Sequence, residues 1–397
     1  MADALFQTYR RIDLSFDKGE GIWLEGSDGR RYMDMGAGIA VCSVGHGHPH
    51  LVETLQEAAA GAWHTSNLFR IPASERLAQR LVDNTFADRV FFCNSGAEAN
   101  EACIKAARRY HFVNGRPERT RIITMSGAFH GRTLGTIAAG GAPKYLEGFG
   151  KPLEGFDQVP VGDIDAVRAA VGPETAAIHV EPVQGEAGII SLDTRVLKAL
   201  REICDEHGLV LSFDEVQCGV GRLGTLFAYQ TAGVTPDILA SAKGLGGGFP
   251  IGACLATEAV AAALEPGTHG TTFGGNRLAG SVGNAVLDII LEPGFLDAVK
   301  TKGAYAKQVF AEVVDSHPSV FELIRGEGLM LGMRCKMPAP EVVAAARAEG
   351  VIMIPAGDNV ARLLPPLIIT EEEIAEAARR VSTAAGKLAA QAGGGSA

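Results

Sequence analysis

The sequence predicts an α/β fold, in which a mostly parallel sheet covered by helices forms a large domain beside a smaller α+β domain. The main observation is that helices alternate with short apolar strands from about Pro72 to about Glu292. These strands are apolar on both faces, which is typical of a parallel sheet buried between two helical layers. A chain of 397 residues, 47% of them hydrophobic, can build such a core, and 50 glycines indicate many tight turns.

The elements can be assigned in chain order. In GIWLEGSDGRRYMDM, two apolar-rich runs flank a Gly-Ser-Asp-Gly turn and predict a β-hairpin. In the alternating region, strands are predicted in RVFFCNSG, RIITMSG, TAAIHVEPVQG, LVLSFDEVQ and DILASAKG. Helices are predicted from Ala97 to Phe112 and from Thr194 to His207.

The break LEPGF, from Leu291 to Phe295, ends the alternating region. The chain after it mixes strands and helices and closes with a helix that begins at a capping box of Thr370 and Glu373. We expect this part to join the N-terminal hairpin, so that the large domain is inserted between two parts of the small one. The expected ranges are 1–60 and 293–392 for the small domain, 61–292 for the large domain and 393–397 for a flexible tail.

Composition argues against several functions. The formal net charge of −10 does not favour nucleic acid or an anionic membrane surface as a partner, so small molecules are expected. No run of 18 apolar residues and no apolar leader segment is present, which predicts a soluble, cytoplasmic protein without membrane contact. The seven cysteines are scattered without a C-x-x-C pair, and HGHPH, His46 to His50, fits a loop better than a ligand set. No metal is expected.

Ligands of open α/β sheets bind beyond the carboxyl ends of the strands, so polar residues directly after apolar runs are candidates. In FFCNSGAEANEACIKAARRY a strand ends at Asn94 and a helix follows at once. Ser95 and Glu98 have the S-x-x-E capping form, with Gly96 and Ala97 between them. Free N–H groups and a hydroxyl at such a helix N-terminus can cradle a phosphate or carboxylate, and a helix cap without a ligand is the alternative.

Two further candidates follow apolar strands. Asp214 in LVLSFDEVQ needs a cationic or N–H partner if it is buried, in a structural ion pair or in a catalytic role. Lys243 lies 29 residues later, in DILASAKGLGGGFPIG, at the end of an apolar run. A lysine in an apolar pocket has a lowered pKa and becomes an amine nucleophile suited to Schiff-base chemistry. A surface lysine in a glycine-rich loop is the structural alternative.

Two arginines complete the candidate set. Arg132 in SGAFHGRTLG and Arg362 in NVARLLPPL could each grip a carboxylate with two parallel hydrogen bonds, although most arginines only solvate a surface. A phosphate cradle, an aspartate for a pyridine nitrogen, a Schiff-base lysine and carboxylate-binding arginines together are what a pyridoxal phosphate enzyme acting on amino acids needs.

Several strings resemble one family and follow its order along nearly the whole chain. They are GAGIAVCSVGHGHPHLV, WHTSNLF, NSGAEANEACIKAARRY, FHGRTLG, EPVQGEAG, FDEVQCGVGRLG, SAKGLGGGFPIGA, HGTTFGGN and RLLPPL. The sequence resembles the class III (ornithine-type) aminotransferases, most closely the acetylornithine aminotransferases. The resemblance implies a fold-type I pyridoxal 5'-phosphate-dependent transferase, and a homodimer whose two active sites lie at the subunit interface.

The resemblance also implies roles around the cofactor ring. Lys243 would join the cofactor as a Schiff base and later move a proton between the substrate carbon and the cofactor. Asp214 would keep the pyridine nitrogen protonated, and Gln217 would bond the ring oxygen. Phe129 would stack on the ring, and Val216 would pack on its other face.

Further implied contacts lie at the phosphate and with the partner subunit. Ser95, Gly96 and Ala97 would cradle the phosphate. Thr272, in HGTTFGGN, would reach the phosphate of the other subunit's cofactor, so that dimerisation completes the site. The adjacent Thr271 is expected to contact substrate.

The implied reaction needs two carboxylate sites, because an ω-amine carries its α-carboxylate far from the reacting nitrogen, whereas 2-oxoglutarate or glutamate carries one beside the reacting carbon. Arg132 would take the distal carboxylate and Arg362 the proximal one. Glu186 in QGEAG resembles the gate residue of the family, which pairs with Arg362 and masks its charge while the amine donor is bound.

Two positions bear on which amine reacts. Gly38 stands where the related ornithine aminotransferases have a tyrosine, and loss of that polar group favours an acylated α-nitrogen, as in N-acetylornithine. N-succinylornithine and N-succinyldiaminopimelate stay as alternatives. Cys42 stands where many relatives have asparagine, and nothing in the sequence says what this change does.

Two rival functions deserve comparison. GVGRLG, Gly219 to Gly224, matches the G-x-G-x-x-G pattern of an NAD-dependent dehydrogenase, but four residues separate it from Asp214 and no long helix is predicted after it. A non-catalytic relative is disfavoured because all the expected catalytic side chains are present.

Overall fold

A computed structural model describes residues 4–394, with side chains described for 4–391. Its largest sheet has seven strands in the order β4-β12-β11-β10-β7-β5-β6. All neighbouring pairs are parallel except those of β12, which runs antiparallel to β11 and β4. The predicted mostly parallel sheet is confirmed. Its strands are Arg89–Cys93 (β4), Arg121–Met125 (β5), Phe156–Val159 (β6), Thr175–Val180 (β7), Val210–Asp214 (β10), Ile238–Ser241 (β11) and Gly252–Ala256 (β12).

Both faces of this sheet are buried. Along β11, Ile238 and Ala240 pack in one apolar cluster with α4, whereas Leu239 packs in the other cluster with α8. Because successive strand residues point to opposite faces, this division places helices on both sides of the sheet. The helices of this part are Pro72–Asp83 (α3), Gly96–Val113 (α4), Leu134–Gly140 (α5), Pro143–Leu146 (α6), Ile164–Ala170 (α7), Thr194–His207 (α8), Ala228–Ala232 (α9), Glu258–Ala261 (α10) and Arg277–Ile290 (α11).

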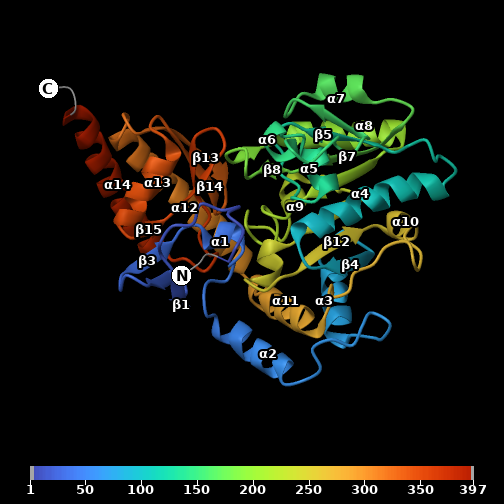
Figure 1. The fold of residues 1–397 in the computed structure, drawn as a ribbon, viewed down its shortest axis with the longest axis horizontal. Coiled ribbons are helices and arrows are strands. Elements are labelled where there is room, and N and C mark those ends of the chain that lie inside the picture. The colour runs from blue at the N-terminus through green and yellow to red at the C-terminus, as the bar shows by residue number, and fades with distance from the viewer. Residues whose placement is uncertain (1–3, 395–397) are drawn as a thin grey trace.

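The N-terminal hairpin joins the C-terminal part of the chain. Strands β1 (Phe16–Glu20), β2 (Trp23–Gly26) and β3 (Arg31–Asp34) form a sheet whose fourth strand is β15 (Val351–Ile352), parallel to β3. Figure 1 shows these blue strands beside the orange and red segments. A second sheet pairs Phe321–Glu327 (β13), Met330–Cys335 (β14), Val360–Leu363 (β17) and Ile354–Ala356 (β16), in that order. The remaining elements are Ala37–Ala40 (α1), Pro49–Ala59 (α2), Val183–Gln184 (β8), Ile190–Ser191 (β9), Lys243–Gly246 (η1), Phe295–Ser316 (α12), Ala339–Ala348 (α13) and Glu371–Gly394 (α14).

The last helix begins at the expected capping box and runs to the end of the described chain. The capping box is confirmed: the Thr370 N–H donates to Glu373 Oε2 at 3.0 Å, and the Glu373 N–H donates to Thr370 Oγ1 at 3.2 Å. The flexible tail expected at 393–397 stays a prediction, and α14 continues through Gly394. The alanine-rich stretch before that residue has high helix propensity and carries the helix onward. Residues 395–397 lie outside the described chain.

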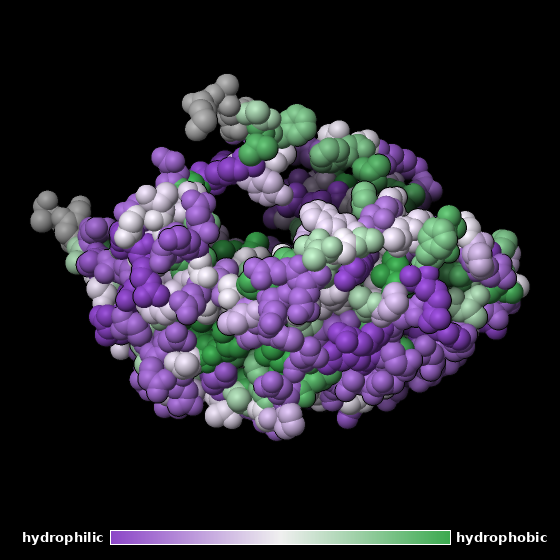
Figure 2. All heavy atoms as spheres, turned by 90° about the horizontal axis from the view of Figure 1, so that it is seen from below, coloured by the Kyte–Doolittle hydropathy of each residue, from purple (hydrophilic) through white to green (hydrophobic). Residues whose placement is uncertain are grey.

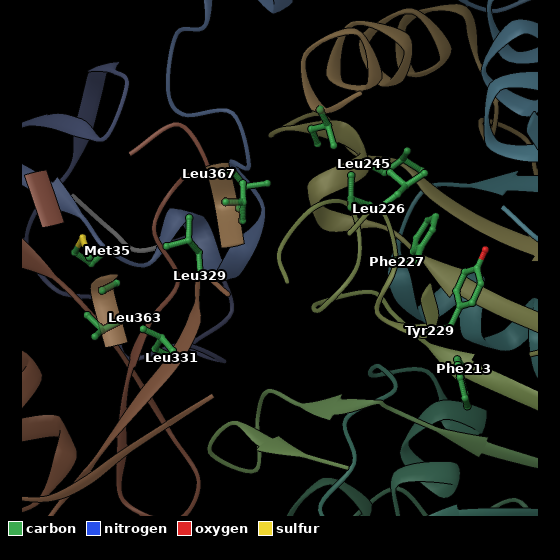
Figure 3. Packing of buried hydrophobic residues seen from close by; sticks show 14 of the residues in the cluster. Met35, Phe213, Leu226, Phe227, Tyr229, Leu245, Leu329, Leu331, Leu363 and Leu367 are labelled. Carbon is green, nitrogen blue, oxygen red and sulfur yellow. The ribbon is translucent and has the colours of Figure 1, made fainter. Parts of the chain in front are cut away.

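The domain boundaries expected at residues 60 and 292 stay a prediction. The N-terminal segment makes contacts on both sides, since its strands join β15 whereas α2 packs against α11 (Figure 1). One apolar cluster also runs through the whole molecule. Figure 3 shows its members Met35, Leu331 and Leu363 among the N- and C-terminal segments, and Phe213 and Leu245 beside the large sheet. No described helix combines the length and the apolar character that a membrane crossing needs.

A buried arginine links the large sheet's loops to the C-terminal part. Arg222 follows β10 by eight residues, is 2% exposed, and donates from Nη1 to Leu329 O at 3.1 Å and to Pro365 O at 2.5 Å. The Leu329 N–H in turn donates to Arg222 O at 3.1 Å. Burial lowers the pKa of Arg222 to about 9, so the guanidinium stays charged at pH 7. This charge is held by carbonyl groups of the C-terminal part.

We therefore expect Arg222→Met to lower the free energy of unfolding by about 2–3 kcal/mol, because it leaves two buried carbonyls without a donor. Urea unfolding at fixed protein concentration measures the change. Arg195→Met, at an arginine whose side chain is 90% exposed, is the control and should change stability by less than about 0.5 kcal/mol. Equal effects of the two substitutions would contradict the proposed link.

Candidate functional site

A cavity of about 450 Å³ opens beyond the carboxyl ends of β4, β7, β10 and β11. This is the position at which open α/β sheets bind ligands. Ten of the sequence-predicted site residues line it: Ser95, Gly96, Ala97, Phe129, Arg132, Glu186, Asp214, Val216, Gln217 and Lys243. The structure thus brings together side chains spread over 149 positions of the chain, from Ser95 to Lys243.

Lys243 begins the 3₁₀ turn η1, two residues after β11. Its backbone has φ 43°, in the left-handed region that residues with a side chain rarely adopt. Its amine forms no hydrogen bond or ion pair with any residue that the structure describes. Burial lowers the pKa of Lys243, and the charge of Arg362 adds to this, against the opposing effect of Glu186. The side chain is therefore an unpaired amine in the cavity, closer to neutral than an ordinary lysine.

Asp214 ends β10 and is held by three donors. Its Oδ2 accepts from Asn100 Nδ2 at 2.7 Å and pairs with His130 Nδ1 at 2.8 Å, and its Oδ1 accepts from the Val216 N–H at 3.0 Å. Burial by itself would raise the pKa of Asp214, but the hydrogen bond and charge of His130 outweigh it, and the pKa is lowered. The cavity thus contains a fixed, ionised carboxylate that can stabilise a cationic ring nitrogen.

The turn at the start of α4 has the form of an anion cradle. Ser95 is the N-cap residue, and its hydroxyl accepts from the Glu98 N–H at 3.2 Å. The first N–H groups of a helix have no partner within it, so those of Gly96 and Ala97 are open to a ligand. A Cβ at Gly96 would lie 2.7 Å from Val216 Cγ1, so glycine lets this turn approach the loop after β10. These residues could hold the phosphate of a cofactor.

Arg362 and Glu186 form an ion pair at the cavity wall. Arg362 lies on β17 with 1% of its side chain exposed, and its Nη1 is 2.5 Å from Glu186 Oε1. Gln217 lies beside both, with its Oε1 3.4 Å from Arg362 Nη1 and its Nε2 3.5 Å from Glu186 Oε1. Burial by itself would raise the pKa of Glu186. The charge and the hydrogen bond of Arg362 outweigh this effect and lower the pKa, so both side chains are charged. The Glu186 side chain is 30% exposed and is the partner with room to move.

Three predicted residues are not in the cavity lining of their own chain: Arg362, which reaches it only through Glu186, and the two threonines Thr271 and Thr272. Thr271 Oγ1 accepts from Asn94 Nδ2 at 3.3 Å and from the Gly274 N–H at 3.1 Å, outside the cavity lining. Thr272 is exposed and borders a separate, small pocket together with Trp63. Neither threonine contacts Lys243 in a single chain.

Four buried residues were not predicted: Asn100, His130, His179 and Glu181. Glu181 directly follows β7, so the rule that found Asp214 also applies to it. Burial raises the pKa of Glu181 well above its usual range, and its Oε2 accepts from the Phe129 N–H at 2.9 Å. His130 lies beside the predicted Phe129, but only the folded chain shows that it contacts Asp214. Asn100 carried no signal in the sequence, since an asparagine within a helix is common.

Within the described residues, one group of side chains is dense enough to hold a metal: His130, His179 and Asp214, whose donor atoms lie within 4.8 Å of one another. Hydrogen bonds engage all three, because His130 pairs with Asp214 and His179 Nδ1 lies 2.7 Å from Ser212 Oγ. We interpret the two histidines as residues that position the Asp214 carboxylate rather than as metal ligands.

The histidines of HGHPH are directed to different partners. His46 Nε2 lies 2.8 Å from Asp34 Oδ2, whereas His50 Nε2 lies 2.9 Å from Asp288 Oδ2. The hydrogen bond with Asp34, aided by Cys42, raises the pKa of His46 to about 9. These two histidines therefore make separate hydrogen bonds, to Asp34 and to Asp288, that fix the loop.

Comparisons with known proteins agree on one family. The family model described as "Aminotransferase class-III" matches residues 6–385. The acetylornithine aminotransferase of Mesorhizobium japonicum is 60% identical over 386 residues, which cover 97% of each chain. The crystal structure of N-acetylornithine aminotransferase from Stenotrophomonas maltophilia has a TM-score of 0.84 and 37% identity, and covers 97% of this chain and 98% of that one.

A more distant solved structure shares the fold. It is an ornithine aminotransferase from Toxoplasma gondii, with a TM-score of 0.91, 30% identity, and coverage of 96% of this chain and 92% of that one. Its title describes partial occupancy of pyridoxal phosphate (PLP) at the active site.

The buried His179 predicts a pH dependence of stability. Burial lowers its pKa to about 3, from 6.5 in an exposed histidine. Between these values the unfolded chain binds a proton that the folded chain does not, so stability falls as the pH falls from 6.5. The contribution from pH 6.5 to pH 5 is about 2 kcal/mol.

We expect His179→Gln to remove this contribution, so that its free energy of unfolding falls by about 2 kcal/mol less than that of the unsubstituted protein between these pH values. Urea unfolding at each pH, at fixed protein concentration, is the measurement. His207→Gln, at an exposed histidine, is the control. The same loss of stability in the His179 variant and the control would show that His179 does not titrate in this way.

Proposed function

Because the chain belongs to the class-III aminotransferases, which depend on pyridoxal 5'-phosphate, we propose that it moves the terminal amino group of N2-acetyl-L-ornithine to 2-oxoglutarate. The products are N-acetyl-L-glutamate 5-semialdehyde and L-glutamate, and the reaction is a step of arginine biosynthesis. The observation that carries the proposal is the unpaired Lys243 amine in one cavity with the ionised Asp214 and with Glu186, the carboxylate that masks Arg362.

The cavity residues fit the cofactor. When bound, pyridoxal phosphate supplies an electrophilic carbonyl carbon and a ring that accepts electrons. Asp214 is kept ionised by its three donors and so stabilises a protonated pyridine nitrogen. Phe129 and Val216 provide the apolar surfaces for the ring, and Gln217 provides an amide for the ring oxygen. The open N–H groups at the start of α4 suit the phosphate.

Lys243 has two tasks in this proposal. Its amine is closer to neutral than that of an ordinary lysine and would hold the cofactor at its carbonyl carbon, because a lone pair is available only on the unprotonated form. With substrate bound, the same amine would carry a proton between the substrate carbon and the cofactor. The lowered pKa suits this task, since a proton carrier works best when its pKa lies near the working pH.

Two carboxylate sites explain how two unlike substrates share the cavity. The acylated amine carries its carboxylate far from the reacting nitrogen, and Arg132 at the cavity rim takes it. During that half-reaction Glu186 neutralises Arg362, so that a buried positive charge does not face an apolar chain. For 2-oxoglutarate, Glu186 moves away and Arg362 binds the carboxylate beside the reacting carbon. Gln217, within 3.5 Å of both, is placed to steady either arrangement.

The choice of an acylated substrate rests on Gly38. It has φ 62°, and a Cβ there would meet nothing closer than Val41 Cβ at 3.7 Å, so the position adds space and no polar group. That environment suits an acyl group better than a free α-ammonium. N-succinylornithine and N-succinyldiaminopimelate carry the same acylated nitrogen and stay as alternative substrates.

We also propose that the protein works as a homodimer in the cytoplasm, with Thr272 reaching the partner subunit's cofactor phosphate. Large apolar side chains are exposed beside Thr272, and a second subunit would cover them. Trp63 is 62% exposed, Leu68 87%, Phe69 69% and Phe273 59%. Figure 2 shows that apolar areas lie among the predominantly hydrophilic surface of one face of the molecule.

The dehydrogenase alternative has little support in the structure. A dinucleotide fingerprint leads into a long helix whose N-terminus meets the pyrophosphate. After GVGRLG the next helix is α9, which has five residues, and Arg222 within the motif is buried against Leu329. The motif therefore packs against the C-terminal part of the chain.

A comparison of amine donors tests the proposed function. With 2-oxoglutarate as acceptor, kcat/KM should be highest for N-acetylornithine or N-succinylornithine and lower for ornithine and 4-aminobutyrate. Lys243→Ala is the negative control and should reduce the rate by about 10²–10⁴-fold or more while the protein stays folded. Lys198→Ala, at an exposed lysine of α8, should keep full activity. A preference for free ornithine, or activity retained without Lys243, would contradict the proposal.

The gate predicts a change of specificity. In Glu186→Ala the charge of Arg362 is unmasked, so short α-amino acids should gain kcat/KM relative to N-acetylornithine, by about tenfold for an interaction of about 1.4 kcal/mol. The measurement is the ratio of kcat/KM for N-acetylornithine to that for L-alanine. Glu202→Ala, at an exposed position of α8, should leave the ratio unchanged. An unchanged ratio in the Glu186 variant would remove the gate from the mechanism.

A further inference from the structure

We infer that Tyr145 holds the Arg132 guanidinium in place, through the face of its ring, for the carboxylate of the amine substrate. Tyr145 lies on α6 and is not part of the cavity lining, so it acts through Arg132 as a positioning residue. The inference rests on the proposed function, in which Arg132 binds the distal carboxylate.

The geometry is a close contact between a cation and a ring. The guanidinium carbon of Arg132 lies 3.9 Å from the centroid of the Tyr145 ring and 5.3 Å from that of Phe129. Among the described residues this is the shortest contact of its kind, and that of Arg109 with Phe112, for example, is 5.8 Å. The Phe129 and Tyr145 rings meet edge to face, with centroids 5.8 Å apart. Two rings that support each other therefore contact one guanidinium.

Apart from the two rings, no described residue fixes the Arg132 side chain. It forms no hydrogen bond or ion pair with any residue that the structure describes, although it is exposed at the cavity rim. Arg362, in contrast, is bound by Glu186, Gly185 O and Pro355 O. A ring face attracts a cation without occupying its N–H groups, so all the donors of Arg132 stay available for a carboxylate.

An aromatic ring can restrain the Arg132 guanidinium without the disadvantages of an acidic partner. A glutamate beside Arg132 would fix the guanidinium, but it would also cancel its charge and compete with the substrate carboxylate. An arginine without any restraint would lose side-chain entropy when it binds the carboxylate. The ring of Tyr145 restrains the side chain before substrate arrives and leaves its charge intact.

The backbone of Arg132 is fixed separately. Gly131, the residue before it, has φ 140°, and a Cβ there would lie 2.6 Å from Ala97 Cβ. This close approach sets the start of the Arg132 side chain against the N-terminus of α4. Tyr145 then fixes its charged end, so the distance between the phosphate cradle and the carboxylate site is defined at both ends.

The test uses unreactive ligands with the holoenzyme. N-acetyl-L-norvaline is N-acetylornithine without its terminal amine, and N-butylacetamide also lacks the carboxylate. In Tyr145→Leu, the Kd for N-acetylnorvaline measured by calorimetry should rise about tenfold, and that for N-butylacetamide should change less than about twofold. KM for N-acetylornithine should rise by a similar factor, with kcat within about twofold. Tyr145→Phe keeps the ring face, so its Kd for N-acetylnorvaline should stay close to that of the unsubstituted protein.

Two controls separate ring electrostatics from structure. Phe112→Leu removes a ring from beside Arg109, far from the cavity, and should leave both Kd values unchanged. Replacement of Tyr145 by pentafluorophenylalanine keeps the ring shape but reverses the charge of its face, and should weaken N-acetylnorvaline binding as leucine does. This variant decides the question if Tyr145→Leu fails to fold.

Several results would overturn the inference: an unchanged Kd for N-acetylnorvaline in Tyr145→Leu, an equal loss for both ligands, or full binding with the fluorinated ring. Failure of the proposed function looks different. In that case the unsubstituted protein would bind both ligands alike and Arg132→Leu would have no effect, which would overturn the carboxylate site and the inference with it.

Discussion

The hydrogen bonds that keep Asp214 ionised inside the protein are the interaction on which the site depends. A buried carboxylate without partners would take up a proton, and a neutral acid could not hold a cationic ring nitrogen. Asn100 from α4, His130 from the loop after β5, and the turn after β10 all have to meet at this one group. The order of the strands in the sheet is what brings these three segments together.

Charge is arranged in the rest of the cavity by the same rule. Each ionised group either has a partner or is left open for a ligand. Arg362 is neutralised by Glu186, whereas burial raises the pKa of Glu181 well above its usual range. Lys243 and Arg132 are the cavity cations without a hydrogen-bond or ion-pair partner among the described residues, and they are the groups for which the proposal assigns a ligand. A cation paired within the protein therefore maintains the site, whereas an unpaired cation is one that the proposal assigns to ligand binding.

Sequence patterns predicted those parts of the fold that carry local signals. The helix expected from Thr194 to His207 has these bounds in the structure, because an aspartate caps its start and a glycine at φ 62° ends it. Strands β6 and β12 were not predicted. The first is four residues long and half polar, and the second, GACLA, consists mostly of small residues with low strand propensity, so that its neighbours β4 and β11 define it. Likewise, the partnership of His130 with Asp214 spans 84 positions and arises only through packing.

The left-handed backbone at Lys243 lowers the stability of the folded chain at a position that the proposed activity requires. A residue with a side chain loses about 1–2 kcal/mol in that conformation, whereas glycine adopts it freely. Selection for stability alone would therefore favour glycine at this position, which several glycines already follow. The chain keeps a lysine there, so the folded protein is less stable than its backbone allows, and the difference is the thermodynamic cost of carrying a reactive amine.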